Sequence, residues 1–222
     1  MGSERCIRDR SNSILITGGA GFIGLHLARQ LVSNGYKVDL VDNLTRGIRD
    51  EDLETLLSQT SVSFTQLDLT DQKSTMVLGS GYHAIYHLAG IVGVKHVLNR
   101  PYEVMDTNIR MLQNVITLAK RQSSLNRLLF ASTSEVYAGT LEKYGLEIPT
   151  VEESNIVVTG LNRPRTSYML SKIVGEVMCQ HCGVPFTIFR PHNIYGPRMG
   201  MAHVIPELLR RVWDIQSPQP LE

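Results

Sequence analysis

Residues 13–24 read Ser-Ile-Leu-Ile-Thr-Gly-Gly-Ala-Gly-Phe-Ile-Gly, a short apolar run that leads straight into glycines at positions 18, 21 and 24. In this pattern Gly18 permits a tight turn, Gly21 lets the backbone approach a pyrophosphate, and Gly24 allows a helix to pack closely on a sheet. A helix that begins after the turn directs its amide groups and the positive end of its dipole toward the anion. The stretch predicts a strand, a dinucleotide-binding turn and a helix; a tight loop without a ligand is the alternative.

Asp42 ends the next apolar run and completes this pattern. An acidic residue at the end of the second strand can accept hydrogen bonds from the adenosine ribose hydroxyls, and it repels a 2′-phosphate. This favours NAD over NADP as the cofactor. Arg46 lies close by in sequence and could instead accommodate a phosphate.

The rest of the chain alternates short apolar runs with helical patterns, which is typical of βαβ units in a parallel sheet. We expect strands near residues 13–17, 37–41, 63–67, 84–88, 127–131 and 186–190. We expect helices near residues 22–33, 50–58, 72–78, 102–122, 166–181 and 203–213, with Gly35 and Gly183 ending the first and the fifth. The predicted fold is α/β, a doubly wound parallel sheet of the Rossmann type with strand order 3-2-1-4-5-6. Residues 137–165, rich in glycine, proline and polar residues, are predicted to be mostly loop.

Composition is that of an ordinary globular protein. The 222 residues are 42% hydrophobic and 19% charged, with a formal net charge of +1. This balance argues against binding to nucleic acid or an anionic membrane, and the apolar runs are too short to span a bilayer. Residues 1–12 lack the apolar segment of a secretory signal, so we interpret them as a flexible arm and expect the protein in the cytoplasm. Residues 13–200 form the predicted NAD-binding domain with the catalytic residues, and residues 201–222 the start of a substrate-binding lobe.

The three cysteines, Cys6, Cys179 and Cys182, argue against a disulfide scaffold. A Cys-x-x-Cys pair can be redox-active or form half of a zinc site. No second Cys/His pair with ligand spacing lies nearby, and residues 179–182 end a predicted helix. We interpret the pair as structural and predict no metal site.

Tyr168 and Lys172 are four residues apart in a predicted helix, so their side chains share one face. A phenol normally titrates near ~10, which is too high for an efficient base at neutral pH. A lysine ammonium nearby, together with a positive nicotinamide ring, would stabilise the phenolate and lower that pKa. Alone, the spacing is also that of an ordinary surface pair on a helix.

A hydroxyl-rich stretch, residues 132–135, follows the fifth predicted strand and reads Ser-Thr-Ser-Glu. A hydroxyl at this edge of the sheet can hydrogen-bond a sugar oxygen that loses its proton, and Glu135 can serve as a second acid or base. Turn formation and helix capping are the alternative roles for such residues. Because residues from three βα turns converge on one edge, we favour the catalytic interpretation.

Motifs along residues 13–215 resemble those of the extended short-chain dehydrogenase/reductases that act on nucleotide sugars, the NAD-dependent sugar-nucleotide epimerase/dehydratase family. Besides the glycine turn, the matching stretches are Asp42-Asn-Leu44, Asp68-Leu69, His87-Leu-Ala-Gly90, Asn108, Ser132-Thr-Ser-Glu-Val-Tyr137, Tyr168-x-x-x-Lys172 and Arg190-Pro-His-Asn-Ile-Tyr-Gly-Pro197. They occur in the order in which the family has them.

The resemblance implies contacts along the whole dinucleotide, beginning with Gly18, Gly21 and Gly24 in the turn. Phe22 and Ile23 would contact the pyrophosphate, Asp42 and Asn43 the adenosine ribose, and Asp68 and Leu69 the adenine. Leu88, Ala89 and Gly90 would line the nicotinamide side, and Asn108 and His192 would complete the cofactor site.

The resemblance also implies the catalytic roles. Thr133 would be the hydroxyl partner, Tyr168 the base, Glu135 a second acid or base, and Lys172 both the activator of Tyr168 and a ligand of the nicotinamide ribose. Ser134, Asn193 and Arg198 would contact the nucleotide-sugar substrate.

In the reaction implied by the family, Tyr168 takes the proton of the sugar 4-hydroxyl while C4 gives a hydride to NAD, which is later regenerated. The Thr133-Ser134-Glu135 trio resembles 4,6-dehydratases and decarboxylases slightly more than UDP-hexose 4-epimerases. A non-catalytic NAD-binding module, or an inactive fragment, is the alternative of another class.

Two features depart from the family pattern. Ala138-Gly139 replaces the usual Gly-Asp after Tyr137. The chain is also shorter than the family norm, so we expect the small C-terminal substrate lobe to be largely missing and substrate binding to be incomplete. Relatives commonly pair through two helices, and we predict a homodimer in which Met105, Met111, Leu112 and Met178 are candidates either for the interface or for the core.

Overall fold

The structure, a computed structural model, describes residues 12–201 and 203–216. The predicted arm, apart from Asn12, and Cys6 therefore lie outside the described residues. The chain divides into two compact units, one ending at His192 and the other beginning at Asn193. The predicted boundary after residue 200 stays a prediction.

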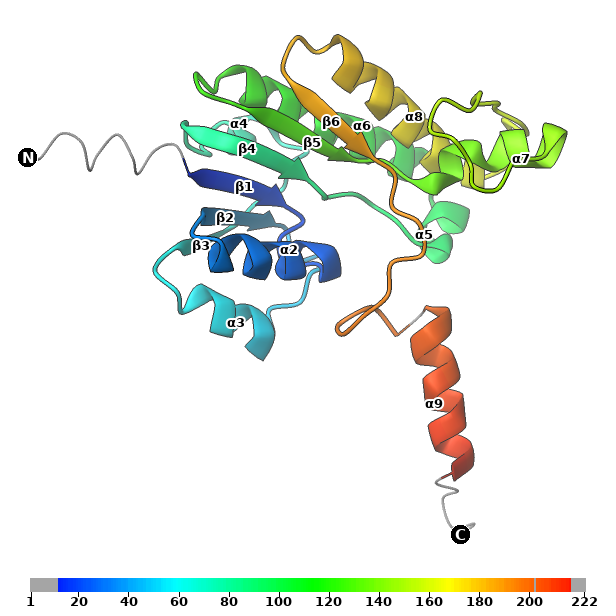
Figure 1. Cartoon of the computed structure of the whole chain (residues 1–222), viewed down its shortest axis with the longest axis horizontal. Coiled ribbons are helices and arrows are strands. Elements are labelled where there is room, and N and C mark those ends of the chain that lie inside the picture. Colours follow the sequence, from blue (N-terminus) through cyan, green and yellow to red (C-terminus); the bar gives the residue numbers. More distant parts are fainter. Residues whose placement is uncertain (1–11, 202, 217–222) are drawn as a thin grey trace, which may run out of the picture. The chain divides into compact units, whose positions relative to one another are not determined.

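One parallel sheet of six strands organises the first unit, in the order β3-β2-β1-β4-β5-β6 (Figure 1). The strands are β1 (Ser13–Thr17), β2 (Lys37–Asp42), β3 (Val62–Gln66), β4 (Tyr82–His87), β5 (Arg127–Ala131) and β6 (Phe186–Phe189). β1 pairs with β2 on one side and with β4 on the other, so the order reverses beside β1. The predicted fold class and strand order are confirmed.

Eight α-helices and one short 3-10 helix accompany the strands within the described residues. They are α2 (Phe22–Ser33), α3 (Glu51–Leu57), α4 (Gln72–Thr75), α5 (Val94–Asn99), α6 (Pro101–Lys120), η1 (Ser134–Tyr137), α7 (Ala138–Tyr144), α8 (Arg165–His181) and α9 (Val204–Gln216), with the numbering beginning at α2. Gly35 and Gly183 follow α2 and α8 with φ of 83° and 77°. Both glycines therefore end their helices as predicted.

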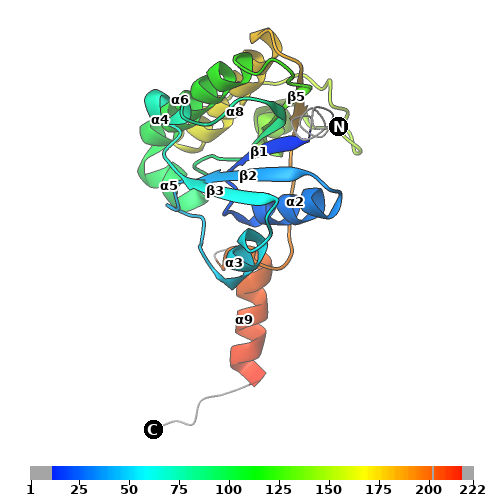
Figure 2. The same ribbon diagram turned by 90° about the vertical axis from the view of Figure 1, so that its left-hand side faces the viewer.

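Two apolar clusters place helices on both faces of the sheet. Leu25 of α2 and Leu53 of α3 pack against Ile16 on one face. Leu112 of α6 and Cys179 of α8 join the cluster on the other face, and Figures 1 and 2 show the two helical layers. Full burial of one such leucine stabilises the fold by about 1.5–3 kcal/mol.

The long helix α6 carries an apolar stripe that is buried, with one exception. Val104, Leu112 and Val115 are buried, whereas Ile109 is only partly so. Met111 and Leu112 belong to the core, so these two candidates for a dimer interface are core residues. The homodimer itself stays a prediction.

The region of residues 137–165 is mostly loop, as predicted, although it opens with the end of η1 and with α7. Gly139 of α7 explains the departure from the family pattern at this point. A Cβ built on Gly139 would lie 1.9 Å from the carbonyl oxygen of Val157. The segment around Val157 can therefore pack on α7 only because residue 139 has no side chain.

Cys179 and Cys182 are both buried and not disulfide-bonded. The Cys182 thiol donates to the carbonyl of Cys179 at 3.0 Å, within the end of α8. In the part of the chain that the structure describes, no group of three or more His, Cys, Asp or Glu side chains could hold a metal ion. Over the same residues, no helix is both long enough and apolar enough to cross a membrane.

Candidate cofactor and catalytic site

The glycine turn between β1 and α2 forms a cradle of backbone atoms. Gly18 has a φ of 72°, and its amide donates to the carbonyl of Val41 at 2.8 Å. A Cβ on Gly24 would lie 2.3 Å from the carbonyl oxygen of Gly18. No side chain caps the amino end of α2 at Gly21, and no acidic residue lies in its first turn. A pyrophosphate fits this cradle, because its charge would meet the helix dipole with no competing carboxylate.

The turn after β4 is joined directly to the turn after β1. The Leu88 amide donates to the Thr17 carbonyl at 3.2 Å, and the Ala89 amide to Thr17 Oγ1 at 3.3 Å. A Cβ on Gly18 would lie 2.9 Å from the Ala89 nitrogen. The predicted pyrophosphate and nicotinamide ends of the site are thus in backbone contact.

The buried side chain of His87 contacts this junction between the two turns. Its Nδ1 lies 2.8 Å from Thr17 Oγ1, and burial, aided by the charge of Lys172, lowers the pKa of His87 to about 3. The ring is therefore neutral at physiological pH.

Asp42 lies at the carboxyl end of β2, as predicted, and already has protein partners. Its Oδ1 accepts from the Leu44 amide at 2.9 Å and its Oδ2 from the Ala20 amide at 3.2 Å. A Cβ on Gly47 would lie 2.9 Å from the Asp42 carboxyl carbon. The carboxylate ties the following loop to the glycine turn, and its further lone pairs could still accept ribose hydroxyls.

A shallow pocket opens at the carboxyl ends of β2 and β3, where the resemblance places adenosine. Asn43 and Asp68 both line it, together with Thr45, Gln66 and Leu67. Leu69 does not line it: this side chain is 4% exposed and packs in the core. Asp68 and Leu69 follow the end of β3, and the predicted adenine contact of Leu69 stays a prediction.

Asn108 of α6 holds the segment after Gly90 in place, and its predicted cofactor contact stays a prediction. Its Oδ1 accepts from the Ile91 amide at 2.7 Å, and its Nδ2 donates to the Ile91 carbonyl at 3.1 Å and to Ser171 Oγ at 3.3 Å. A Cβ on Gly90 would lie 3.5 Å from Lys172 Nζ. Asn108 thus fixes the distance between the nicotinamide-side loop and α8.

Tyr168, Thr133 and Lys172 come together at the carboxyl edge of the sheet. Burial raises the pKa of Tyr168 to about 12, while a hydrogen bond with Thr133 and the charge of Arg46 lower it and Glu135 raises it. We predicted a lowered pKa from Lys172 and a cofactor charge together; the protein's own groups have the opposite net effect. Desolvation of the phenol outweighs the favourable contacts.

Lys172 is almost fully buried and fixed in place. Its Nζ donates to the Ala131 carbonyl at 2.8 Å and lies 5.8 Å from the centroid of the Tyr168 ring and 5.1 Å from that of Phe130. Burial lowers the pKa of Lys172 to about 8. The ammonium is therefore held against the end of β5, one residue before the hydroxyl-rich stretch.

Glu135 and Ser134 occupy the outer side of this edge. Glu135 lies 3.8 Å from Arg165 in an exposed ion pair, and Ser134 donates its amide to the Pro191 carbonyl at 3.2 Å. His192 ends the first unit and is exposed. Asn193 and Arg198 belong to the second unit, where Asn193 is exposed and Arg198 has a φ of 71°; their substrate contacts stay predictions.

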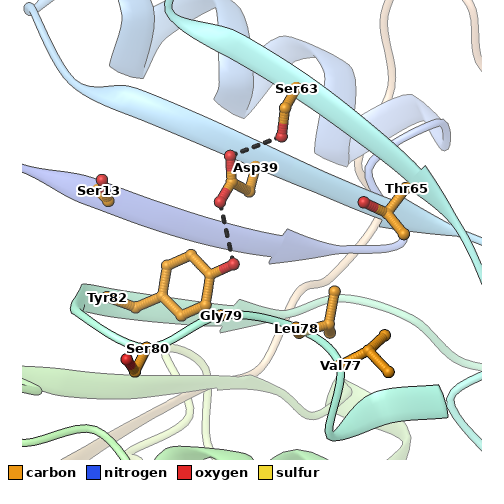
Figure 3. Close-up of a pocket in the computed structure, with 9 residues that line it drawn as sticks. All are labelled: Ser13, Asp39, Ser63, Thr65, Val77, Leu78, Gly79, Ser80 and Tyr82. Atoms are coloured by element: carbon orange, nitrogen blue, oxygen red, sulfur yellow. Dashed lines mark hydrogen bonds between the residues drawn. The ribbon is translucent and has the colours of Figure 1, made fainter.

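A second depression lies at the opposite edge, near the amino ends of the strands, and Figure 3 shows its lining. Asp39 is its only charged residue and is satisfied internally. It accepts from the hydroxyl of Tyr82 at 2.9 Å and from that of Ser63 at 2.6 Å. Because this carboxylate is already hydrogen-bonded, the depression offers no set of reactive groups comparable with Tyr168, Thr133 and Lys172.

Comparison with known proteins gives concordant matches. Residues 14–220 match the model of a family described as NAD dependent epimerase/dehydratase. The chain is 36% identical over 203 residues to UDP-N-acetyl-alpha-D-glucosaminuronate decarboxylase of Bacillus cytotoxicus, an alignment that covers 88% of this chain and 60% of the relative.

Two solved structures have the same fold at higher coverage. A UDP-galactose 4-epimerase superposes with a TM-score of 0.74 at 29% identity, covering 92% of this chain and 64% of that one. The dTDP-glucose 4,6-dehydratase DesIV of Streptomyces venezuelae, with NAD bound, gives 0.76 at 26% identity, covering 91% and 62%. The chain spans about 60% of the length of these relatives.

Proposed function

Because the chain belongs to the NAD-dependent epimerase/dehydratase family, we propose that it oxidises C4 of a nucleoside-diphosphate hexose transiently, with NAD as a regenerated cofactor. Membership of the family confirms the predicted cofactor. The observation that carries the proposal is the meeting of the Tyr168 phenol, the Thr133 hydroxyl and the Lys172 ammonium beside the turn after β4. The chain spans about 60% of the length of these relatives, so the activity of the whole protein is likewise a proposal.

Each of these groups has a distinct task. Thr133 orients the sugar 4-hydroxyl, and Tyr168 accepts its proton. Bound NAD supplies a hydride acceptor for C4. A phenol with a pKa of about 12 is a poor base at neutral pH, so positive charge brought close to it decides its reactivity. Lys172 provides such a charge and is cationic below a pH of about 8.

Glu135 favours a dehydratase or decarboxylase over a 4-epimerase. Its carboxylate is close enough to influence the pKa of Tyr168, and an acid or base there can move a second proton once C4 is oxidised. The similar proteins include a decarboxylase, a 4,6-dehydratase and a 4-epimerase. A UDP-hexose 4-epimerase, which needs no second proton transfer, is the runner-up.

A non-catalytic NAD-binding module is the candidate of another class, and the raised pKa of the Tyr168 phenol is the observation that favours it. Incubation with NAD and a panel of UDP-, GDP- and dTDP-hexoses and UDP-glucuronate, followed by mass spectrometry and NMR, separates the two. New sugars support the enzyme; NAD binding without turnover at high protein concentration supports the module.

Tyr168→Phe tests the proton transfer itself. The variant keeps the ring and loses the hydroxyl, so conversion should be abolished while affinity for NAD changes little. Tyr102→Phe is the matched control, because Tyr102 is 79% exposed on α6. Conversion that persists in Tyr168→Phe would rule out the phenol as the base.

A further inference from the structure

Glu176 is a buried carboxylate on the same face of α8 as Tyr168 and Lys172. It follows Lys172 by four residues and Tyr168 by eight, so the three side chains stack along the helix. Glu176 is 4% exposed. A carboxylate this deeply buried is costly unless it is paired, so its partners indicate its purpose.

Both oxygens of Glu176 are engaged. Oε1 accepts from Ser132 Oγ at 2.5 Å and from Arg190 Nε at 2.8 Å. Oε2 accepts from Arg190 Nη2 at 2.7 Å. The two bonds from Arg190 form a bidentate, charge-assisted pair, the arrangement with the most restricted geometry among ion pairs.

Ser132 connects this ion pair to the catalytic hydroxyl, because Thr133 is the next residue. The Ser132 amide donates to the Phe189 carbonyl at 2.8 Å, and that of Ser134 to Pro191 at 3.2 Å. The backbone on both sides of Thr133 is thereby fastened to the end of β6. The Ser132–Glu176 bond adds a third fastening, this one to the helix that carries Tyr168.

Arg190 extends the network to the loop beyond α7. Its Nη1 donates to the Tyr137 hydroxyl and, at 2.9 Å, to the Glu152 carbonyl. The guanidinium carbon lies 4.9 Å from the centroid of the Tyr137 ring. One guanidinium therefore connects the end of η1, this loop and α8.

We propose that Glu176 is a positioning residue which, through Ser132 and Arg190, fixes the Thr133 hydroxyl against the Tyr168 phenol. The proposal rests on the function proposed for these two hydroxyls. A contribution to stability alone is a weaker explanation, since buried ion pairs add little compared with apolar packing of the same volume. Directional bonds at both oxygens are instead suited to holding one geometry.

The test measures the contact between Thr133 and Tyr168 in the full chain without cofactor or sugar. With the Thr133 methyl and the Tyr168 ring isotope-labelled, their nuclear Overhauser effect reports the contact directly. The variants are Glu176→Gln, which removes the charge, and Ser132→Ala, which removes only the hydroxyl. Two variants are controls. Ser132→Thr keeps the hydroxyl, and Glu54→Gln removes a carboxylate of α3 from its exposed ion pair with Arg49.

We expect the effect to be lost in Glu176→Gln and Ser132→Ala and to persist in Ser132→Thr and Glu54→Gln. A signal of wild-type intensity in folded Ser132→Ala overturns the proposal, even if Glu176→Gln fails to fold. Where turnover is found, kcat of Ser132→Ala should fall roughly tenfold or more, with affinity for NAD unchanged. Because the nuclear Overhauser effect requires no turnover, an inactive chain would count against the proposed function and leave the positioning test decisive.

Discussion

Replacing Gly21 and Gly24 separately by alanine should separate NAD binding from folding, because the added methyl group meets different surroundings at the two positions. At Gly24 it would lie 2.3 Å from the Gly18 oxygen and 2.9 Å from the Gly19 Cα, both backbone atoms of the turn. At Gly21 its closest neighbour is the Gly18 oxygen at 3.1 Å. The φ and ψ of Gly21, −77° and 172°, are also accessible to alanine.

The two substitutions should have opposite signatures. Gly24→Ala forces α2 away from the turn, and such overpacking costs about 1–3 kcal/mol, partly offset by a gain in helix propensity of about 1 kcal/mol. The net loss, about 1 kcal/mol in the middle of this range, lowers the Tm by roughly 2–4 °C for a chain of this size. Gly21→Ala should change stability by less than about 1 kcal/mol yet weaken NAD binding at least tenfold, or about 1.4 kcal/mol, because the methyl group occupies the approach of the pyrophosphate.

Thermal unfolding followed by circular dichroism and calorimetric titration with NAD measure the two effects. Gly79→Ala is the control, since a Cβ there meets no atom within 4 Å. The reasoning fails if Gly21→Ala binds NAD like the wild type, or if Gly24→Ala melts together with Gly79→Ala.

Two further substitutions test the charges around the site. Asp42→Ala should narrow the difference in affinity between NAD and NADP, measured by titration with each, because the carboxylate at the end of β2 no longer repels a 2′-phosphate; unchanged discrimination would contradict its role. Lys172→Met tests the lowered pKa: between pH 8 and 10.5 the unfolded chain binds one proton more than the folded chain, so wild-type stability rises with pH there. Relative to Lys172→Met, the wild-type free energy of unfolding should rise by on the order of 3 kcal/mol across this window. Urea unfolding of both proteins at each pH measures it. If the difference between the two free energies does not change with pH, the buried ammonium is not destabilised.

The strands were predictable because short, mostly apolar runs alternate with helical patterns along the chain, although Ser63 and Thr65 of β3 are exposed. β1 and β5 match the predicted ranges, and the other four differ by one or two residues at one or both ends. The glycine turn and Asp42 were predictable for the same reason: all their determinants lie within one βαβ unit.

Two short helices, α5 and α7, and the buried ion pair could not be predicted from local patterns. α5 has six residues and begins at Gly93 without a side-chain cap, and α7 depends on the approach of residue 157 to Gly139. Glu176 of α8 meets Ser132 after β5 and Arg190 after β6, which are 44 and 14 residues away in sequence. The only local signal was a charged residue on the sheet-facing side of α8, one turn after Lys172.

The direct contact between the turns after β1 and β4 has a consequence for recognition. Thr17 and Gly18 touch Leu88 and Ala89 through main-chain atoms, so the two turns cannot slide apart independently. The sheet therefore fixes the distance between the two turns, and with it the separation between the two ends of any dinucleotide bound there. A bound molecule has to match this distance. The conformational entropy of ordering the two turns is lost when the chain folds, so binding does not have to offset it.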